Sequence, residues 1–333
     1  MASSRRHRNA DVPVEIVQLE GLVALKIIKH CEEESDDGID LVQGVLLGLV
    51  VDQKLEITNC FPIPRASADE FDNLKFQMEV MRNLRHVNVD HLHVGWYQST
   101  FYGSFLNKTL LDSQFTYQSQ IEESVALIYD PTKTAKDQLS LRAFRLSKAM
   151  MEMRKKEDFS AETIKANGLS FETMFEEIPV VLRNSHLNNV TLCEIESKLA
   201  SKKTFNNLDM ATGNVMENYL RLLMDSVEDL SQDTNKYLNY QKLFLKQQYS
   251  KDQQIAKRQA EDADRISRGE EPLGTDDILK NFKPLPPAQR LEGLLLSSQV
   301  QTYSDELLQF ATQSFGKLFM AKSLQPPSST NSI

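Results

Sequence analysis

The pattern of apolar and polar positions changes character about halfway along the 333-residue chain. In the first half, short apolar runs typical of strands alternate with stretches at helical spacing. Residues 43–51 and 55–63 are rich in β-branched side chains and predict a hairpin. Residues 67–84 predict an amphipathic helix capped by Ser67 or Asp69. Strands interleaved with helices indicate an α+β fold, a central β-sheet flanked by helices.

The strand pattern ends near residue 205, and long helical patterns follow it. Apolar positions recur at the period of an α-helix, first before and then after a stretch that is rich in charge and contains prolines. Both ends of the chain offer little apolar surface, so we expect flexible tails there. The predicted organisation is a flexible basic tail (1–13), a first domain with its extension (14–204), a long amphipathic helix (205–250), a charged and Pro-containing linker (251–286), a C-terminal helix (287–322) and a flexible tail (323–333).

Two long amphipathic helices cannot enclose a core by themselves, so their apolar faces need the first domain or another protein. We expect these helices to anchor the chain to partner proteins, and the first domain to fold without them. Two helices of the first domain also carry more apolar positions than one side of a small sheet needs, which makes them a second candidate surface. The candidate partner-binding residues are Leu22, Leu25, Ile28, Met78, Met81, Val215, Tyr219, Leu223, Val227, Leu230, Tyr237, Tyr240, Phe244, Leu291, Leu295, Leu307 and Phe310.

Charge and cysteine usage exclude several function classes. The net charge is −9, which argues against a protein whose main task is to coat nucleic acid. Arg5, Arg6 and Arg8 could touch RNA, but a short charge run in an acidic chain is more often a solvated tail. The three cysteines form no CxxC pair, which indicates reduced intracellular thiols. The longest apolar run, 45–51, is too short to cross a membrane, so we expect a soluble, cytoplasmic protein.

The segment VGWYQST at residues 94–100, preceded by the predicted hairpin and helix, resembles the MPN domain. The resemblance covers about residues 14–146. Catalytic members of that family are JAMM zinc isopeptidases, in which two His and one Asp hold zinc and a Glu activates the bound water. The resemblance places other residues at those positions: Leu41 for the Glu, Gln98 and Thr100 for the two His, Lys108 for the Ser, and Leu111 for the Asp.

This substitution pattern implies an MPN domain without catalysis, metal or cofactor. Neutral amide and hydroxyl groups bind zinc poorly, and a leucine cannot act as a base. A one-residue shift would bring Asp112 to a ligand position, but both His and the Glu would still be missing. His91 and His93 form a His-x-His pair before the Gly-Trp-Tyr turn, without a carboxylate at the family spacing. A zinc isopeptidase with an unconventional site is therefore the alternative hypothesis.

Two further segments, residues 17–30 and FEEIPVV at 175–181, narrow the resemblance to the non-catalytic MPN subunits of eukaryotic translation initiation factor three. The resemblance implies a scaffold that pairs with a second MPN-domain subunit, while its C-terminal helices join the helical tails of other subunits. It also implies contact with the small ribosomal subunit through the assembled complex. Two more hypotheses are a scaffold subunit of the proteasome lid or the signalosome, and a nucleic-acid-binding module.

Overall fold

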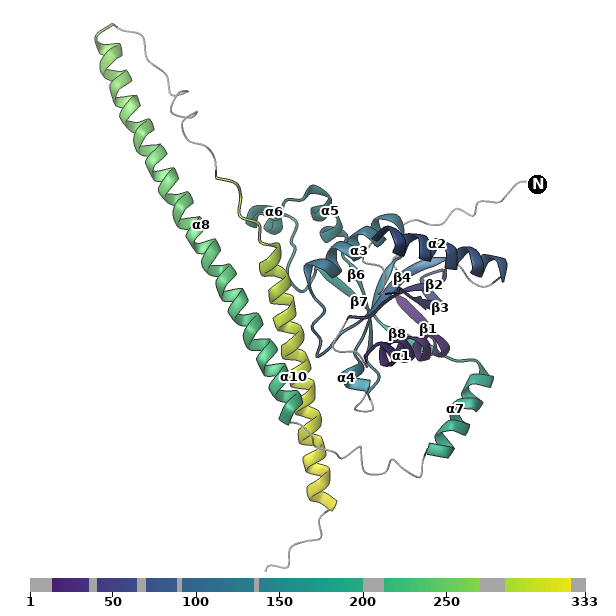
Figure 1. Cartoon of the computed structure of the whole chain (residues 1–333). Coiled ribbons are helices and arrows are strands. Elements are labelled where there is room, and N and C mark those ends of the chain that lie inside the picture. Colours follow the sequence, from purple (N-terminus) through teal and green to yellow (C-terminus); the bar gives the residue numbers. More distant parts are fainter. Residues whose placement is uncertain are drawn as a thin grey trace, which may run out of the picture.

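The computed structural model describes residues 14–35, 41–64, 70–88, 92–134, 138–199, 213–269 and 285–324, and every structural statement below refers to these residues. It has a sheet-containing domain and two long helices that lie side by side (Figure 1). The strands are β1 (Ile16–Glu20), β2 (Gln43–Val51), β3 (Lys54–Pro62), β4 (His93–Ser99), β5 (Val125–Tyr129), β6 (Leu141–Leu146), β7 (Phe175–Ile178) and β8 (Val180–Arg183). The helices are α1 (Gly21–Ser35), α2 (Glu70–His86), α3 (Lys108–Gln120), α4 (Pro131–Thr134), α5 (Lys148–Lys156), α6 (Ala161–Ala166), α7 (His186–Leu199), α8 (Gly213–Ser267) and α10 (Leu291–Leu324).

All eight strands belong to one mixed sheet of order β7-β6-β5-β4-β2-β3-β1-β8. The predicted hairpin is confirmed, since β2 and β3 pair antiparallel from Gly44–Pro62 to Val51–Lys54. Asp52 makes the tight turn between them in the left-handed conformation, with φ of 54°. The predicted helix of residues 67–84 corresponds to α2, and its proposed caps Ser67 and Asp69 lie outside the described residues.

The two edges of the sheet are joined by a single residue, Pro179. β7 pairs antiparallel with β6, whereas β8, directly after the proline, pairs parallel with β1 at the opposite edge. The Val17 amide donates to the Pro179 carbonyl over 3.0 Å. The segment 175–183 therefore closes the curled sheet, which protects edges that would otherwise be open to association.

Helices cover both faces of the sheet. Successive side chains of a strand point to opposite faces, and β2 places apolar side chains on both of them. Leu46 of β2 belongs to the main core, which also contains Val23 and Ile27 of α1. Its neighbours Val45 and Leu47 pack with Phe61 beneath α2 on the other face. In Figure 1, α1 lies on one side of the sheet and α2 and α3 lie on the other.

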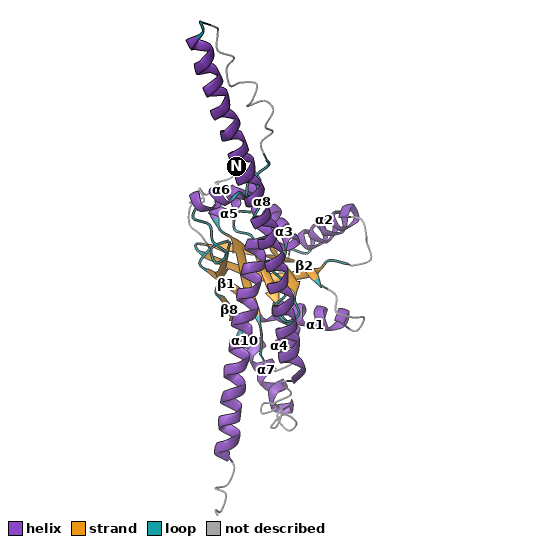
Figure 2. Cartoon of the chain, turned by 90° about the vertical axis from the view of Figure 1, so that its left-hand side faces the viewer, coloured by secondary structure: helices purple, strands orange, loops and turns teal. Residues whose placement is uncertain are grey.

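The two C-terminal helices form an antiparallel hairpin, with α10 between α8 and the domain (Figures 1 and 2). Tyr219 of α8 lies 6.5 Å from Phe310 of α10, between ring centroids. At the other end of the contact, the Arg290 guanidinium lies 4.4 Å from the Tyr237 ring and bonds to Asp233 over 3.1 Å. None of the described helices combines the length and the apolar character that a membrane span requires.

The predicted linker 251–286 needs a correction, because α8 continues without a break to Ser267. The segment up to Gly269 contains no proline, and its Lys, Gln, Ala and Glu residues favour helix. Charges at helical spacing add support, as between Arg258 and Glu261. The helix ends at Ser267, and Gly269 follows it with a φ of 81°, which suits the residue after a helix C-terminus.

The structure bears on the expectation that the first domain folds without the C-terminal helices, because α10 contributes to the core of that domain. Leu291 and Leu295 of α10 are buried in a core cluster with Leu111, Met150 and Met153 of the domain. Just before α10, the Arg290 amide bonds to the carbonyl of Phe159 over 3.0 Å. The first turns of α10 thus complete a core to which α3 and α5 contribute.

Candidate functional site

Two of the positions that correspond to catalytic residues in MPN isopeptidases, Gln98 and Thr100, lie at the end of β4. Gln98 and Thr100 are only 3% and 2% exposed. β4 lies between β2 and β5, so that Gln98 faces Gln43, whose Nε2 donates to the Gln98 Oε1 over 3.2 Å. Opposite Tyr97, Gly44 is required, since a Cβ there would lie 2.3 Å from the tyrosine ring. Gly95, Trp96 and Tyr97, which the sequence analysis described as a turn, lie within β4. The strand holds Gln98 in the sheet, and Thr100 follows directly after it.

The other aligned positions lie further apart. Leu41 precedes β2 and is 49% exposed. Lys108 opens α3 on the surface, next to the N-cap Asn107. Leu111 is fully buried in the cluster with Met150, away from Trp96, whereas its neighbour Leu110 packs with Trp96. Leu110 therefore lies against the face of β4 that Gln98 shares by alternation.

The side chains at the aligned positions offer few groups that could bind a metal ion or act as a general base. No described group of three or more His, Cys, Asp or Glu side chains is placed to hold a metal ion. The Thr100 Oγ1 is buried without a hydrogen-bond partner. Asp112, the residue that a shifted alignment would use, bonds instead to Arg154 over 2.9 Å. A leucine, an amide and a hydroxyl offer neither a general base nor an anionic ligand.

His93, the member of the His-x-His pair that the structure describes, is held by contacts within the domain. Its Nε2 lies 2.8 Å from the Gly95 carbonyl oxygen, and its ring packs edge-on against Tyr117. Burial holds the pKa of His93 below its usual value, against the opposing effect of the Gly95 hydrogen bond. His91 lies outside the described residues.

We expect the lowered pKa of His93 to make the fold less stable in mild acid. Below pH of about 6.5 the unfolded state binds a proton that the folded state resists, so stability is full above this pH and falls as pH decreases. The slope from one such group is at most about 1.4 kcal/mol per pH unit. Urea unfolding at several pH values should show a smaller acid loss for His93→Gln than for the parent chain. Equal losses would contradict this linkage.

The loop that follows the aligned ligand positions, residues 101–107, is covered by the helix hairpin. Asn218 of α8 donates to the Tyr102 hydroxyl over 3.0 Å, and Tyr219 packs edge-on against the Tyr102 ring. Gln299 of α10 accepts from the Leu106 amide over 2.9 Å and donates to the Gly103 carbonyl over 2.8 Å. The chain's own helices thus occupy the surface beside the aligned site.

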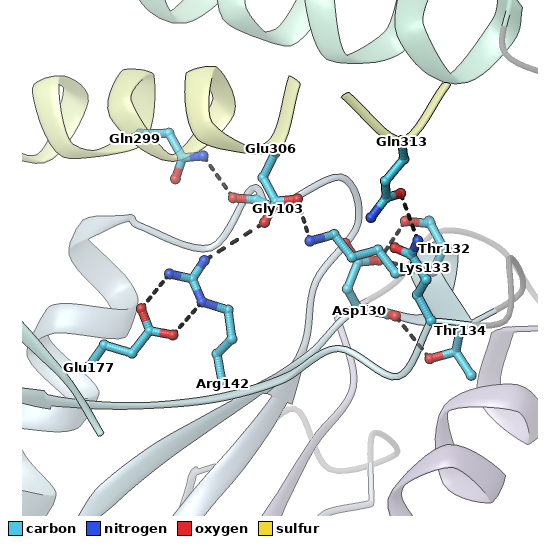
Figure 3. Close-up of polar contacts among 11 residues, drawn as sticks. Gly103, Asp130, Thr132, Lys133, Thr134, Arg142, Glu177, Gln299, Glu306 and Gln313 are labelled. Carbon is cyan, nitrogen blue, oxygen red and sulfur yellow. Dashed lines mark hydrogen bonds and ion pairs between the residues drawn. The ribbon is translucent and has the colours of Figure 1, made fainter. Parts of the chain in front are cut away.

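An ionic cluster extends this contact along α10 (Figure 3). Glu306, only 8% exposed, pairs with Lys133 and lies 3.8 Å from Arg142. Arg142 bonds also to Glu177 over 2.6 Å, and this hydrogen bond is the main cause that raises the pKa of Arg142. Nearby, burial raises the pKa of Asp130.

Sequence reasoning did not find Gln299 or Glu306. The signal was present, because both polar residues interrupt a row of apolar positions on one face of the helix, with Leu291, Leu295 and Tyr303. A glutamine or glutamate in such a row is either exposed or buried with a partner. Here both residues are buried, and both have partners in the domain.

Comparisons with known proteins place this architecture in a family. Residues 13–123 match the family model described as JAB1/Mov34/MPN/PAD-1 ubiquitin protease, and residues 134–330 match the model of the C-terminal region of eIF3h. The H subunit of eukaryotic translation initiation factor 3 from Nematostella vectensis is 53% identical over 98% of this chain and 99% of its own length. The H-B form from Danio rerio is 52% identical over 99% and 100%, and the H subunit from Aedes aegypti is 43% identical over 98% of each chain.

The chain belongs to the eIF3h family, the H subunits of eukaryotic translation initiation factor 3. The expected MPN domain, followed by long C-terminal helices, is confirmed. A protein of the eIF3h family is a translation initiation factor with an MPN domain. The C-terminal model begins at residue 134 and therefore also covers β6, β7 and β8 of the sheet.

In this member of the eIF3h family, the candidate partner residues of the first domain lie on opposite faces of the sheet. Leu22 and Leu25 of α1 are about half exposed, at 50% and 51%, whereas Ile28 packs partly against the main core. Met78 of α2 is 65% exposed, whereas Met81 of the same helix packs against the cluster that contains Val45 and Phe61. The two helices therefore offer two separate surfaces rather than one.

The candidate residues of α8 and α10 divide between buried and exposed positions. Leu291, Leu295 and Tyr219 are buried within the chain, so they pack against the domain and the hairpin rather than facing a partner. Val227 and Phe244 are 47% and 40% exposed. The remaining candidates are half-buried: Val215, Leu223, Leu230, Tyr237, Tyr240, Leu307 and Phe310.

A second apolar stripe of α8 is exposed, and of its residues sequence analysis singled out only Val227. It consists of Met216, Leu220, Met224, Val227, Leu238, Leu245 and Tyr249, each at least 38% exposed. These residues are separated by steps of three or four positions or by sums of such steps, so they share one side of the helix. On a helix of 3.6 residues per turn, they lie to one side of the face of Tyr219 and Tyr237 that meets α10. The hairpin thus carries apolar surface beyond what it uses internally.

Proposed function

We propose that the chain is a non-catalytic scaffold subunit of eukaryotic translation initiation factor 3, acting in the cytoplasm. One observation carries the non-catalytic part: Gln98 and Thr100, at the aligned ligand positions, are buried neutral groups, and the chain's own hairpin covers the adjoining loop. Membership of the multi-subunit factor rests on the named relatives, which match nearly the whole chain.

The scaffold works through two kinds of surface. The MPN domain, residues 14–204 with its extension, pairs with a second MPN-domain subunit. The exposed apolar stripe of α8 joins the helical tails of other subunits of the same factor, because large contiguous apolar surfaces on a soluble protein mark association sites. Contact with the small ribosomal subunit then comes through the assembled complex.

Two competing functions are less well supported. A zinc isopeptidase of the JAMM class needs a ligand set that the described residues do not offer. Scaffold subunits of the proteasome lid or the signalosome share the domain type, but the relatives that match over nearly the full length are named as initiation factor subunits. Sequence similarity over α8 and α10 therefore favours the initiation factor.

Affinity purification with quantitative mass spectrometry tests the proposal. The tagged full-length chain should recover the other initiation factor 3 subunits in near-equal amounts, together with small-subunit ribosomal proteins that are lost at high salt. A tagged chain with Gln232→Asp, a change at an exposed polar position of α8, is the matched control and should behave identically. Recovery of proteasome lid or signalosome subunits in place of initiation factor subunits would overturn the proposal.

We expect a charge on one of the two exposed helix surfaces of the domain to abolish MPN pairing. Met78→Asp tests α2 and Leu25→Asp tests α1, and both side chains are exposed enough to change without loss of the fold. A carboxylate buried in an apolar interface should weaken pairing at least about 100-fold. Val51→Asp, at the exposed β2–β3 turn, is the control. Normal pairing of both helix variants, measured by pull-down with the partner subunit, would exclude these surfaces.

A further inference from the structure

The loop of residues 101–107 has an unusual backbone conformation that presents polar groups to α10. Tyr102 and Gly103 both adopt left-handed backbone angles, with φ of 56° and 74°. A tyrosine in this conformation is uncommon and costs energy, which the contacts of its ring with Asn218 and Tyr219 of α8 offset. The turn leaves the Gly103 carbonyl and the Leu106 amide directed toward the same side chain of α10.

Gln299 fits these two backbone groups in a way that other side chains do not. A carboxamide has both a donor and an acceptor, and Gln299 uses each of them here while it is only 6% exposed. A leucine would leave a buried amide and a buried carbonyl without partners, which is costly. If α10 were displaced by one turn, Leu295 or Tyr303 would take the place of Gln299. A leucine has neither a donor nor an acceptor, and a tyrosine carries both on one oxygen rather than on two separate atoms.

Glu306 provides a second polar contact on the same face of α10. It lies seven residues after Gln299, two helical turns or about 10.5 Å along the axis. Its carboxylate meets Lys133 from α4 and Arg142 from β6 (Figure 3). Gln313, a further two turns on, accepts from Gln138 over 2.7 Å. Polar partners of the domain therefore meet α10 at a seven-residue interval.

We propose that loop 101–107, together with Lys133 and Arg142, is a docking socket for a helix, and that Gln299 and Glu306 fix the register of α10 in it. The socket rests on the proposed scaffold function, since it holds α8 and its exposed apolar stripe at a set orientation to the MPN domain. Leu291 and Leu295 supply apolar contact, which tolerates sliding, whereas paired buried polar groups accept one register. In this proposal, the loop of residues 101–107 beside Gln98 and Thr100 helps to hold the helices of the scaffold in place.

Hydrogen exchange of the purified full-length chain, read by mass spectrometry, tests the socket. Gln299→Leu should raise the exchange rates of the peptides that contain residues 101–107 and 295–306 at least tenfold, and leave β1 to β3 unchanged. Gln301→Leu, two residues away at an exposed position of α10, is the matched control and should match the parent chain. Equal exchange in Gln299→Leu and Gln301→Leu would overturn the proposal.

A second pair of variants covers the case in which Gln299→Leu does not fold. Glu306→Gln keeps the side-chain shape and removes the charge that meets Lys133 and Arg142, so exchange in residues 303–313 should rise at least tenfold. Glu292→Gln, exposed in the first turn of α10, is its control. Unchanged exchange in Glu306→Gln would also overturn the socket. Because only the isolated chain is measured, this result is independent of whether the chain joins initiation factor 3.

Discussion

Removal of all residues after 204 is expected to leave an MPN domain that no longer folds stably. The truncation deletes Leu291 and Leu295, which are 8% and 5% exposed and pack with Leu111, Met150 and Met153. Full burial of one leucine contributes roughly 1.5 to 3 kcal/mol, against a total stability of about 5–15 kcal/mol for a typical domain. The truncated domain should bind a dye for exposed apolar surface and unfold at a much lower urea concentration.

Point variants separate this core effect from the general consequences of truncation. Leu295→Ala in the full chain should lower the free energy of unfolding by about 2–5 kcal/mol, as is usual for a buried leucine. Leu308→Ala, at a 67% exposed position of the same helix, should change it by less than about 0.5 kcal/mol. Urea unfolding of both variants provides the comparison. A cooperative, fully stable truncated domain together with a neutral Leu295→Ala would contradict the role of α10 in the core.

Charge on the exposed stripe of α8 is expected to remove the chain from its complex without unfolding it. Met224 and Val227 are 70% and 47% exposed and lie on the side of α8 that α10 does not cover. Two buried carboxylates in an apolar interface should cost at least about 3 kcal/mol, which corresponds to more than 100-fold in affinity. Met224→Asp with Val227→Asp should therefore recover few helical partner subunits in a pull-down, with unchanged circular dichroism.

The matched control for this stripe carries the same change of charge on another side of α8. Gln232→Asp with Asn239→Asp adds two carboxylates at exposed polar positions and should assemble normally. If the control assembles as poorly as Met224→Asp with Val227→Asp, net charge rather than the apolar stripe governs assembly. If both variants assemble fully, the stripe is not a partner surface.

Local patterns predicted those elements whose signal lies within a short window. The β2–β3 hairpin follows from two β-branched runs around Asp52, and α8 follows from apolar residues at helical period. The closing strand 175–183 was not predicted, because it is short and Pro179 interrupts its pattern. The end of α8 was misplaced, because a mixed-charge helix and a solvated linker share the same composition.

Contacts between distant segments could not be read from periodicity. The apolar face from Val215 to Tyr237 was assigned to partners, yet its nearest neighbour is α10 of the same chain. An apolar stripe on a helix shows that something must cover that face. It does not show which segment or which protein does so. The positions of Gln98 and Thr100 in the site followed from the resemblance of residues 94–100 to the MPN domain. The cover of the adjoining loop by α10 was not predictable, because Gln299 lies 193 residues from Leu106.

The most direct test of the central claim, that the MPN site has lost its chemistry and the domain serves as a scaffold, is to measure bound zinc in the purified full-length chain. The chain is expressed with added zinc and assayed in parallel for cleavage of a ubiquitin conjugate. The account predicts zinc far below one ion per chain and no cleavage, because Leu41, Gln98 and Thr100 offer no base and no anionic ligand. One tightly held zinc ion per chain, together with cleavage that Gln98→Ala abolishes, would contradict it.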